Sequence, residues 1–153
     1  TETVEGATVW ALDSGFQPIP GSERHFEIDT ICLAVGLSPL AELLWQADCK
    51  MGYVSELGGY TPLRNENYET TRPGVFIAGD LAGIEEASSA MIEGTIAGLS
   101  AAKSLGYQTD DFNERLSRAK AELRAFRQGP TSQKVRQGIA KLAALTEGVR
   151  AFD

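Results

Sequence analysis

A short apolar run that ends in Gly-Asp and leads into a long helical stretch most constrains the fold of this 153-residue chain. Residues 75–78 have the length and composition of a buried strand, and Gly79-Asp80 breaks it. A helix is expected from Ile84 to about Leu105, with Gly106 as its C-cap. A strand, a tight turn and a helix in this order predict a βα unit of an α/β fold.

Small residues dominate the helix expected at 84–105. They are Ala87, Ser88, Ser89, Ala90, Gly94, Ala97, Gly98, Ser100, Ala101 and Ala102. A glycine inside a helix costs about 1 kcal/mol relative to alanine, so Gly94 and Gly98 need a structural reason. We expect this helix to pack closely against another backbone, such as the face of a sheet.

A second apolar run, from Thr30 to Val35, is continuous and is followed by Gly36. Such a run is typical of a strand buried on both faces, as in a parallel sheet covered by helices. Cys32 is then expected to be a small buried hydrophobe rather than a reactive thiol. The pattern that follows predicts a short helix over residues 39–48, with Pro39 in its first turn and Ser38 as its N-cap.

The segment before this run favours strands. Residues 4–12 are rich in β-formers and end at the turn signal Asp13-Ser14-Gly15. Residues 24–28 alternate polar and apolar side chains, as a half-exposed strand does. This position makes His25 a surface residue rather than a catalytic base.

The C-terminal tail reads as two amphipathic helices separated by Gly129-Pro130. The apolar stripe of the first consists of Phe112, Leu116, Ala119, Leu123 and Phe126, and that of the second of Val135, Ile139, Leu142, Leu145 and Val149. Asp111 with Glu114 makes a capping pair for the first helix. We expect the two stripes to pack on each other and on the rest of the chain.

Charge and composition exclude several classes of function. The net charge is −7, and residues 1–109 carry five Lys and Arg against fifteen Asp and Glu, which argues against nucleic acid as a partner. There is no apolar run long enough for a membrane-spanning helix and no secretory signal, so cytoplasmic location is the expectation. Two cysteines without a Cys-x-x-Cys pair and a single histidine predict neither a disulfide framework nor a metal site.

The chemistry of the chain is expected at Gly79 and Asp80. Glycine lets a bulky group approach the backbone, and a carboxylate at the C-terminal end of a strand can accept hydrogen bonds from ribityl hydroxyls. The following helix supplies free N–H groups and a partial positive charge at its first turn, where Glu86 and Ala87 lie. In the alternative interpretation Asp80 caps a helix and Gly79 turns a corner. Acids such as Glu85 and Glu86 are also favoured in a first turn for dipole reasons alone.

Two motifs together resemble a known family. The run from Thr71 to Asp80, Thr-Arg-Pro-Gly-Val-Phe-Ile-Ala-Gly-Asp, with the small-residue helix after it, resembles the second FAD motif of the pyridine nucleotide-disulfide oxidoreductase-like flavoproteins. The run from Asp29 to Pro39 resembles the strand by which these proteins pass from the NAD(P) domain back to the FAD domain. Within the family the likeness is to alpha subunits such as those of opine oxidase, hydrogen cyanide synthase and sarcosine oxidase.

The resemblance implies an α/β fold: a fragment of a two-dinucleotide-binding-domain (FAD/NAD(P)) flavoprotein with a C-terminal helical hairpin. Residues 1–38 would end the NAD(P)-binding domain, 39–106 would be the second segment of the FAD-binding domain, and 107–153 would be the helical tail. Gly79, Asp80, Glu86 and Ala87 would contact FAD, and NAD(P) is the second cofactor that the family uses. The implied activity is that of an FAD-dependent oxidoreductase, with no residue of this chain as a catalytic acid, base or nucleophile.

One departure from the family pattern limits what this chain would do alone. No Gly-x-Gly-x-x-Gly loop occurs in it, although the family uses two such loops for the pyrophosphates of its cofactors. We therefore expect the FAD and NAD(P) loops to lie N-terminal to Thr1, and the chain alone to be inactive. An incomplete sheet predicts self-association or pairing with a second subunit. The alternative is a non-catalytic module for assembly or subunit docking in a flavoprotein complex.

Overall fold

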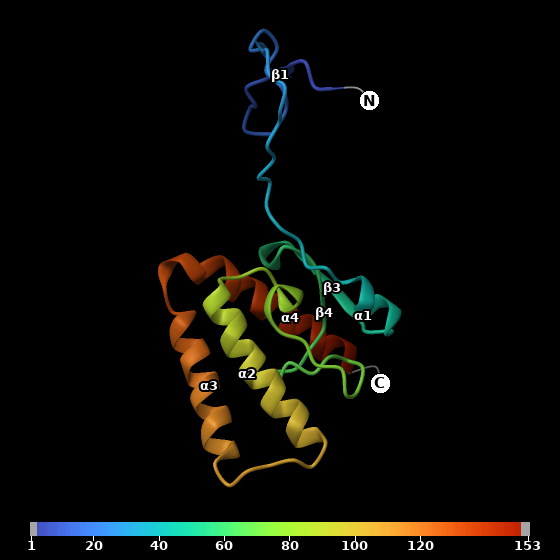
Figure 1. Cartoon of the computed structure of the whole chain (residues 1–153), viewed down its shortest axis with the longest axis vertical. Helices are drawn as coiled ribbons and strands as arrows, with labels where there is room; N and C mark the ends of the chain where they lie inside the picture. Colours follow the sequence, from blue (N-terminus) through green and yellow to red (C-terminus); the bar gives the residue numbers. More distant parts are fainter. Residues whose placement is uncertain (1–2, 151–153) are drawn as a thin grey trace. The chain divides into compact units, whose positions relative to one another are not determined.

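The computed structural model describes residues 3–150 and divides into two compact units, Thr1–Val35 and Gly36–Asp153. The outermost residues of the expected first and last segments, 1–2 and 151–153, lie outside the described residues. The first unit is a small antiparallel pair of strands, and the second carries the helices. Figure 1 shows both units, and the candidate sites discussed below lie in the second.

The first unit is built on strands β1 (Ala7–Val9) and β2 (Arg24–Phe26), with Thr8 opposite His25. The turn signal at residues 13–15 is confirmed: Asp13 Oδ1 accepts hydrogen bonds from the backbone N–H groups of Gly15 and Gln17. His25 is exposed and its Nδ1 lies 3.1 Å from Thr8 Oγ1, so the prediction of a surface histidine is confirmed.

The strand expected over residues 30–35 is absent from the structure. These residues form no ladder, and Ile31, Leu33 and Val35 are 50%, 80% and 90% exposed. Cys32 is exposed too, so the expectation of a buried thiol was wrong. A parallel strand needs a neighbour on each side and helices on both faces. The two sheets among the described residues, β1-β2 and β3-β4, are antiparallel pairs and supply no such neighbour.

The second unit begins with helix α1 (Glu42–Gln46), shorter than the helix expected over 39–48. Its N-cap is Ala41, with no side-chain capping bond, so Ser38 does not cap it. Strands β3 (Met51–Val54) and β4 (Gly59–Pro62) then form a hairpin joined by the 3₁₀ turn η1 (Ser55–Leu57). The hairpin packs against one tail helix and supplies one of the two apolar cores.

The run at 75–78 is not a regular strand. Phe76 forms a single bridge with Glu69, while Thr70 and Ile77 close flanking hydrogen bonds of 2.9 and 3.0 Å to Val75 and Tyr68. Ile77 is nevertheless buried in the larger apolar core, as the apolar pattern requires. The prediction of a buried apolar segment holds, but the prediction of a ladder strand was wrong because only one bridge pairs the run with its neighbour.

Helix α2 (Ala87–Ser104) begins three residues later than expected. The N–H of Ile84 is used by the carbonyl of Leu57 at 2.9 Å, and Glu86 has an extended backbone, so the helix starts only after it. Its end matches the prediction. Gly106 has φ +81°, its N–H bonds the carbonyl of Lys103, and the N–H of Tyr107 bonds that of Ala102, which is the Schellman pattern.

Gly94 and Gly98 do not pack against another backbone in this structure. Both face open space, with no atom within 4 Å of a Cβ built at either position. The expectation of close packing was therefore wrong for the chain as it stands. That face of α2 is exposed, because the described residues contain no larger sheet to cover it.

The tail forms helices α3 (Phe112–Phe126) and α4 (Gln133–Arg150), linked by the 3₁₀ turn η3 (Pro130–Ser132). The two helices do not pair mainly with each other, as a hairpin would. Helix α3 lies alongside α2, and α4 packs on β3 and η1 (Figure 1). Asp111 is the N-cap residue of α3 but makes no side-chain capping bond, so the expected capping pair is not formed.

Candidate functional site

The four residues expected to contact a flavin lie at the start of α2 and in the turn before it. Gly79 and Asp80 open the 3₁₀ turn η2 (Gly79–Ala82), and Glu86 and Ala87 begin α2. A Cβ on Gly79 would lie 3.4 Å from Ala90, which places the turn against the first turns of the helix. Asp80, Glu86 and Ala87 are exposed, and no hydrogen bond joins them to one another.

The backbone of the turn requires glycine at position 79. Gly79 has φ +68°, a conformation in which a side chain is strained. The N–H of Gly79 donates to the Oε2 atom of Glu93, one and a half turns into α2, at 2.8 Å. A buried carboxylate on the helix therefore holds the turn in place.

Glu93 is the centre of a buried polar network that sequence reasoning missed. Its Oε1 accepts hydrogen bonds from the hydroxyl of Tyr68 at 2.8 Å and from Nη2 of Arg127 at 2.5 Å. Arg127 also donates two hydrogen bonds to Glu85, from Nε to Oε1 at 3.0 Å and from Nη2 to Oε2 at 2.5 Å. The network thus connects helix α3, the turn at Gly79 and the segment before α2.

The three charged side chains of this network are shielded from solvent. The side chains of Arg127, Glu85 and Glu93 are 13%, 9% and 4% exposed. Burial alone would lower the pKa of the Arg127 guanidinium, but hydrogen bonds and charge interactions with Glu85 and Tyr68 together outweigh burial and raise that pKa above its ordinary value. Arg127 therefore stays charged, and its charge compensates the two carboxylates.

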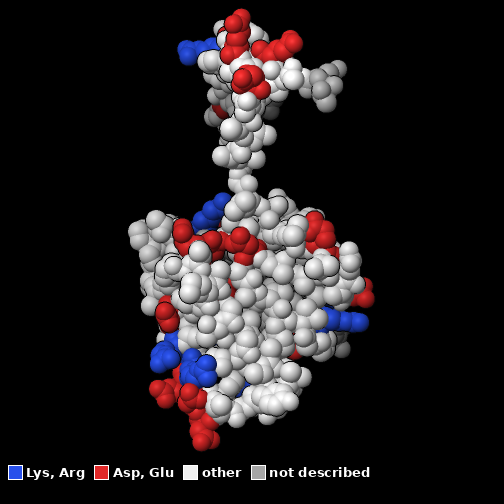
Figure 2. Space-filling view, viewed as in Figure 1, with Lys and Arg blue, Asp and Glu red and all other residues white. Residues whose placement is uncertain are grey.

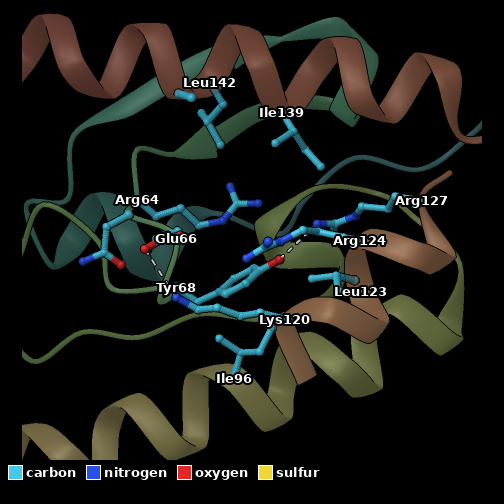
Figure 3. Close-up of a pocket in the computed structure, with 12 residues that line it drawn as sticks. Arg64, Glu66, Tyr68, Ile96, Lys120, Leu123, Arg124, Arg127, Ile139 and Leu142 are labelled. Carbon is cyan, nitrogen blue, oxygen red and sulfur yellow. Dashed lines mark hydrogen bonds and ion pairs between the residues drawn. The ribbon is translucent and has the colours of Figure 1, made fainter. Parts of the chain in front are cut away.

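Tyr68 occupies an unusual backbone position in this network. It has φ 64°, which a bulky residue adopts only when its surroundings over-determine it. Burial and the neighbouring Glu93 raise the pKa of the Tyr68 hydroxyl to about 12. The hydroxyl is therefore a hydrogen-bond donor to Glu93 at any physiological pH. The hydrogen bond from Arg127 Nη1, at 3.3 Å, appears in Figure 3.

Sequence reasoning missed Glu93, Tyr68 and Arg127 because their contact depends on the tertiary structure. Tyr68 and Arg127 are 59 residues apart in the chain. One signal was available: Glu93 is a charged residue on the otherwise apolar and small-residue face of the helix. A lone acid among such residues indicates a buried partner.

The described residues contain no helix with both the length and the apolar character of a transmembrane span. Within the same residues, no group of three or more His, Cys, Asp and Glu is placed to hold a metal ion.

A family model described as pyridine nucleotide-disulphide oxidoreductase matches residues 2–94, and the chain belongs to this family. Its members are flavin- and pyridine nucleotide-dependent oxidoreductases with an FAD/NAD(P)-binding α/β fold. The prediction of the family from the two motifs is confirmed.

Curated relatives agree with this assignment. The chain is 29% identical over 108 residues to the A subunit of opine oxidase from Agrobacterium tumefaciens (strain Ach5), which covers 70% of the chain and 22% of the relative. It is 30% identical over 86 residues to the corresponding opine oxidase polypeptide of Rhizobium meliloti, 56% of the chain and 16% of the relative. The chain thus spans about a fifth of the length of these relatives. No solved structure matches it significantly.

Proposed function

We propose that Gly79, Asp80, Glu86 and Ala87 form the ribityl and isoalloxazine side of an FAD site in an FAD-dependent oxidoreductase. The observation that carries the proposal is the hydrogen bond between the Gly79 N–H and Glu93. It fixes the turn against α2 by its backbone and leaves the Asp80 carboxylate exposed and available to a ligand. The alternative interpretation, in which Asp80 caps the helix, receives no support because the N-cap of α2 is Glu86.

The start of α2 suits a group that gains negative charge. Ala87 and Ser88 are exposed at the first turn, where backbone N–H groups have no intrahelical acceptor. Together with the helix dipole, such groups stabilise negative charge nearby by about 0.3–1 kcal/mol. A bound flavin would supply the hydride-transfer chemistry, and these residues would bind and orient it. Residues 79–87 offer no pyrophosphate loop, so the chain alone would hold FAD weakly.

The relatives suggest the setting in which this site works. They are named as the A subunits of opine oxidases, and we propose that this chain acts within one subunit of a multi-subunit oxidase of the same class. The remaining FAD and NAD(P) elements would come from N-terminal domains of the same polypeptide. Amines, amino acids or opines would be the substrate class, and NAD(P) would be the second nucleotide.

Flavin content tests the proposed site directly. We expect Asp80→Ala to lower the flavin absorbance per protein of the natural full-length protein several-fold. Asp110→Ala, which removes an equally exposed carboxylate from the α2–α3 connection, should leave it unchanged. Both variants should keep the wild-type circular dichroism. Equal flavin content in all three proteins would remove Asp80 from the site.

A second candidate function is subunit docking without catalysis. Several large apolar residues are exposed around the start of the second unit, namely Leu37, Leu40 and Leu43, which are 70%, 80% and 75% exposed. In Figure 2 the charged side chains of this unit gather toward the margins of the visible face, and its middle is largely uncharged. Exposed apolar surface of this kind favours association with another chain or with a second copy.

Sedimentation distinguishes this candidate from the enzymatic one. If docking is the function, Leu40→Ser with Leu43→Ser should shift the chain toward monomer without changing flavin content. If the double variant loses flavin but keeps its oligomeric state, these residues serve the cofactor domain instead of a subunit interface.

A further inference from the structure

A cavity of about 230 Å³ lies beneath the tail helices and takes no part in the proposed flavin site. Its apolar wall consists of Ile96, Leu123, Ile139, Leu142 and Ala143. Its charged wall consists of Arg64, Glu66, Lys120, Arg124 and Arg127. Figure 3 shows these side chains converging on one space from α2, α3, α4 and the segment after β4.

Arg64 is the unusual member of this set. Its Nη1 atom is buried and has no hydrogen-bond partner among the described residues. The guanidinium carbon lies 5.0 Å from the centre of the Tyr68 ring, a cation–π contact that does not supply a hydrogen-bond acceptor for Nη1. Burial lowers the pKa of Arg64 from its ordinary value, and the opposing influence of Tyr68 and Glu93 does not cancel that effect.

The other charges around the cavity are already compensated, with one exception. Arg127 is paired with Glu85 and Glu93, and both oxygens of Glu93 are in use. Lys120 lies 3.5 Å from Glu66 and donates to Asn67 at 2.6 Å. Within the described part of the chain, Arg124 at the exposed rim has no ion-pair partner. The cavity therefore has a surplus of positive charge at Arg64 and Arg124.

An unpaired buried hydrogen-bonding group costs free energy, and a buried charge without a partner costs more. An anion that enters the cavity would remove this cost at Arg64. The planar guanidinium matches a carboxylate in two parallel hydrogen bonds. A phosphate dianion is usually held by several backbone N–H groups or more than one arginine. Of the two buried guanidiniums at the cavity, that of Arg127 is already paired with Glu85 and Glu93, which leaves that of Arg64 for a ligand.

We propose that this cavity binds a small organic anion whose carboxylate pairs with Arg64 and whose apolar body lies against Leu123, Ile139 and Leu142. The cavity is smaller than the roughly 300–1,000 Å³ of pockets for drug-sized ligands, so the ligand is small. Because α3 and α4 both line the cavity, the bound anion also secures the tail to the body of the second unit. This site does not depend on the proposed flavin site.

Calorimetric titration of the full chain with hexanoate tests the proposal. We expect saturable binding of hexanoate and at least tenfold weaker binding of hexanamide, which has the same apolar body without the charge. Inorganic phosphate at equal ionic strength should not displace hexanoate. Equal binding of the amide, displacement by phosphate, or no saturable binding of hexanoate would each overturn the proposal.

Hexanoate binding to arginine variants tests whether the anion binds in this cavity. Arg64→Gln should weaken hexanoate about tenfold or more, since a hydrogen bond to a charged group contributes about 1.5–3 kcal/mol. Arg124→Gln at the exposed rim should weaken it about two- to fivefold. Arg118→Gln, an exposed arginine on α3 that does not line the cavity, should bind as the wild type does.

A second variant controls for loss of folding, because Arg64 is half-buried and its Nη1 atom is inaccessible to solvent. Ala143→Phe places a ring at the rim of the cavity from an exposed position on α4. It should retain the wild-type circular dichroism and lose hexanoate binding. Wild-type affinity in this variant, or in a folded Arg64→Gln, would show that hexanoate binds elsewhere and would overturn the proposal.

Discussion

Both tail helices bury apolar side chains against the second unit, and α3 adds a buried charge network to that packing. The C-cap residue of α3 is Arg127, whose buried guanidinium pairs with two carboxylates, Glu85 and Glu93. Helix α4 carries a more exposed ion pair, between Lys141 and Glu56, and its Leu142 packs into an apolar cluster with Val54, Leu57 and Leu63. The two helices therefore share apolar burial, whose contribution depends on the volume filled, and differ in the buried charge of Arg127, whose contribution depends on geometry.

The difference matters for function because the charge network around Arg127 includes a contact with the candidate flavin turn. Glu93 holds Arg127 with one oxygen and the Gly79 N–H with the other. The position of α3 is therefore linked to the turn that carries Asp80. Helix α4 contacts β3 and η1, so its apolar packing supports the hairpin instead.

The largest effect is expected from removing the buried cation. Arg127→Ala should lower the free energy of unfolding by about 3–5 kcal/mol, because it leaves two carboxylates buried without compensation. Urea unfolding measures this change. Arg124→Ala, one turn earlier on the exposed face of α3, should change it by no more than about 0.5 kcal/mol. Similar values for the two variants would mean that the network does not attach α3.

The apolar attachment of α4 should respond to lost volume. Leu142 is 3% exposed, and Leu142→Ala should cost about 2–5 kcal/mol in urea unfolding. Leu145 lies on the same stripe but is 44% exposed, so Leu145→Ala should cost about 1 kcal/mol. If Leu145→Ala proves the more costly, the cluster around Leu57 is not the main contact of α4.

High pH should weaken the charge network but not the apolar cluster. The pKa of Tyr68 is about 12 in the folded chain and about 10 when unfolded. Its contribution to stability is therefore complete below pH 10 and is lost as pH rises from 10 to 12. Between pH 9 and 11.5 the wild type should lose about 2 kcal/mol more than Tyr68→Phe. Tyr107→Phe, at a residue 73% exposed, should behave as the wild type does.

The smallest effects compare two glycines on α4. A Cβ at Gly138 would lie 2.7 Å from Leu57 Cγ and 2.9 Å from Glu56 Cβ, so Gly138→Ala should destabilise by about 1–2 kcal/mol. Gly148 faces open space, and Gly148→Ala should stabilise by about 0.5–1 kcal/mol through helix propensity. Thermal unfolding of both variants shows the opposite signs. Two shifts of the same sign would contradict the close contact between α4 and η1.

Local patterns were sufficient for the extent of α3 and for the end of α2, but not for the starts of α1 and α2. The periodic stripe at Phe112 to Phe126 predicted α3 within its observed bounds, and Gly106 was identified as the C-terminal glycine of α2. These features depend on residues close in sequence, whose preferences survive without long-range partners. The apolar runs at 30–35 and 75–78 were different, since a strand exists only where another segment pairs with it.

The residues of the candidate site also fall into those predictable from local sequence and those that depend on tertiary contacts. Gly79 and Asp80 were found from their place between an apolar run and a helix, and the family assignment followed from motifs in a fixed order. In the sequence, Glu93 is recognisable only as an isolated acid on an apolar helix face. No local sequence pattern indicates a special role for Arg127 or Arg64. Their roles come from contacts between residues tens of positions apart.

The sequence alone determined the family, the existence of the helices and the turn at Gly79, because each depends on neighbouring residues or on the order of motifs. Only the tertiary structure decided that a tail arginine and a helix glutamate hold that turn, and that another arginine is left unpaired in a cavity. The physical reason is that pairing and burial of charge depend on which distant segments meet, and local preference does not specify that meeting.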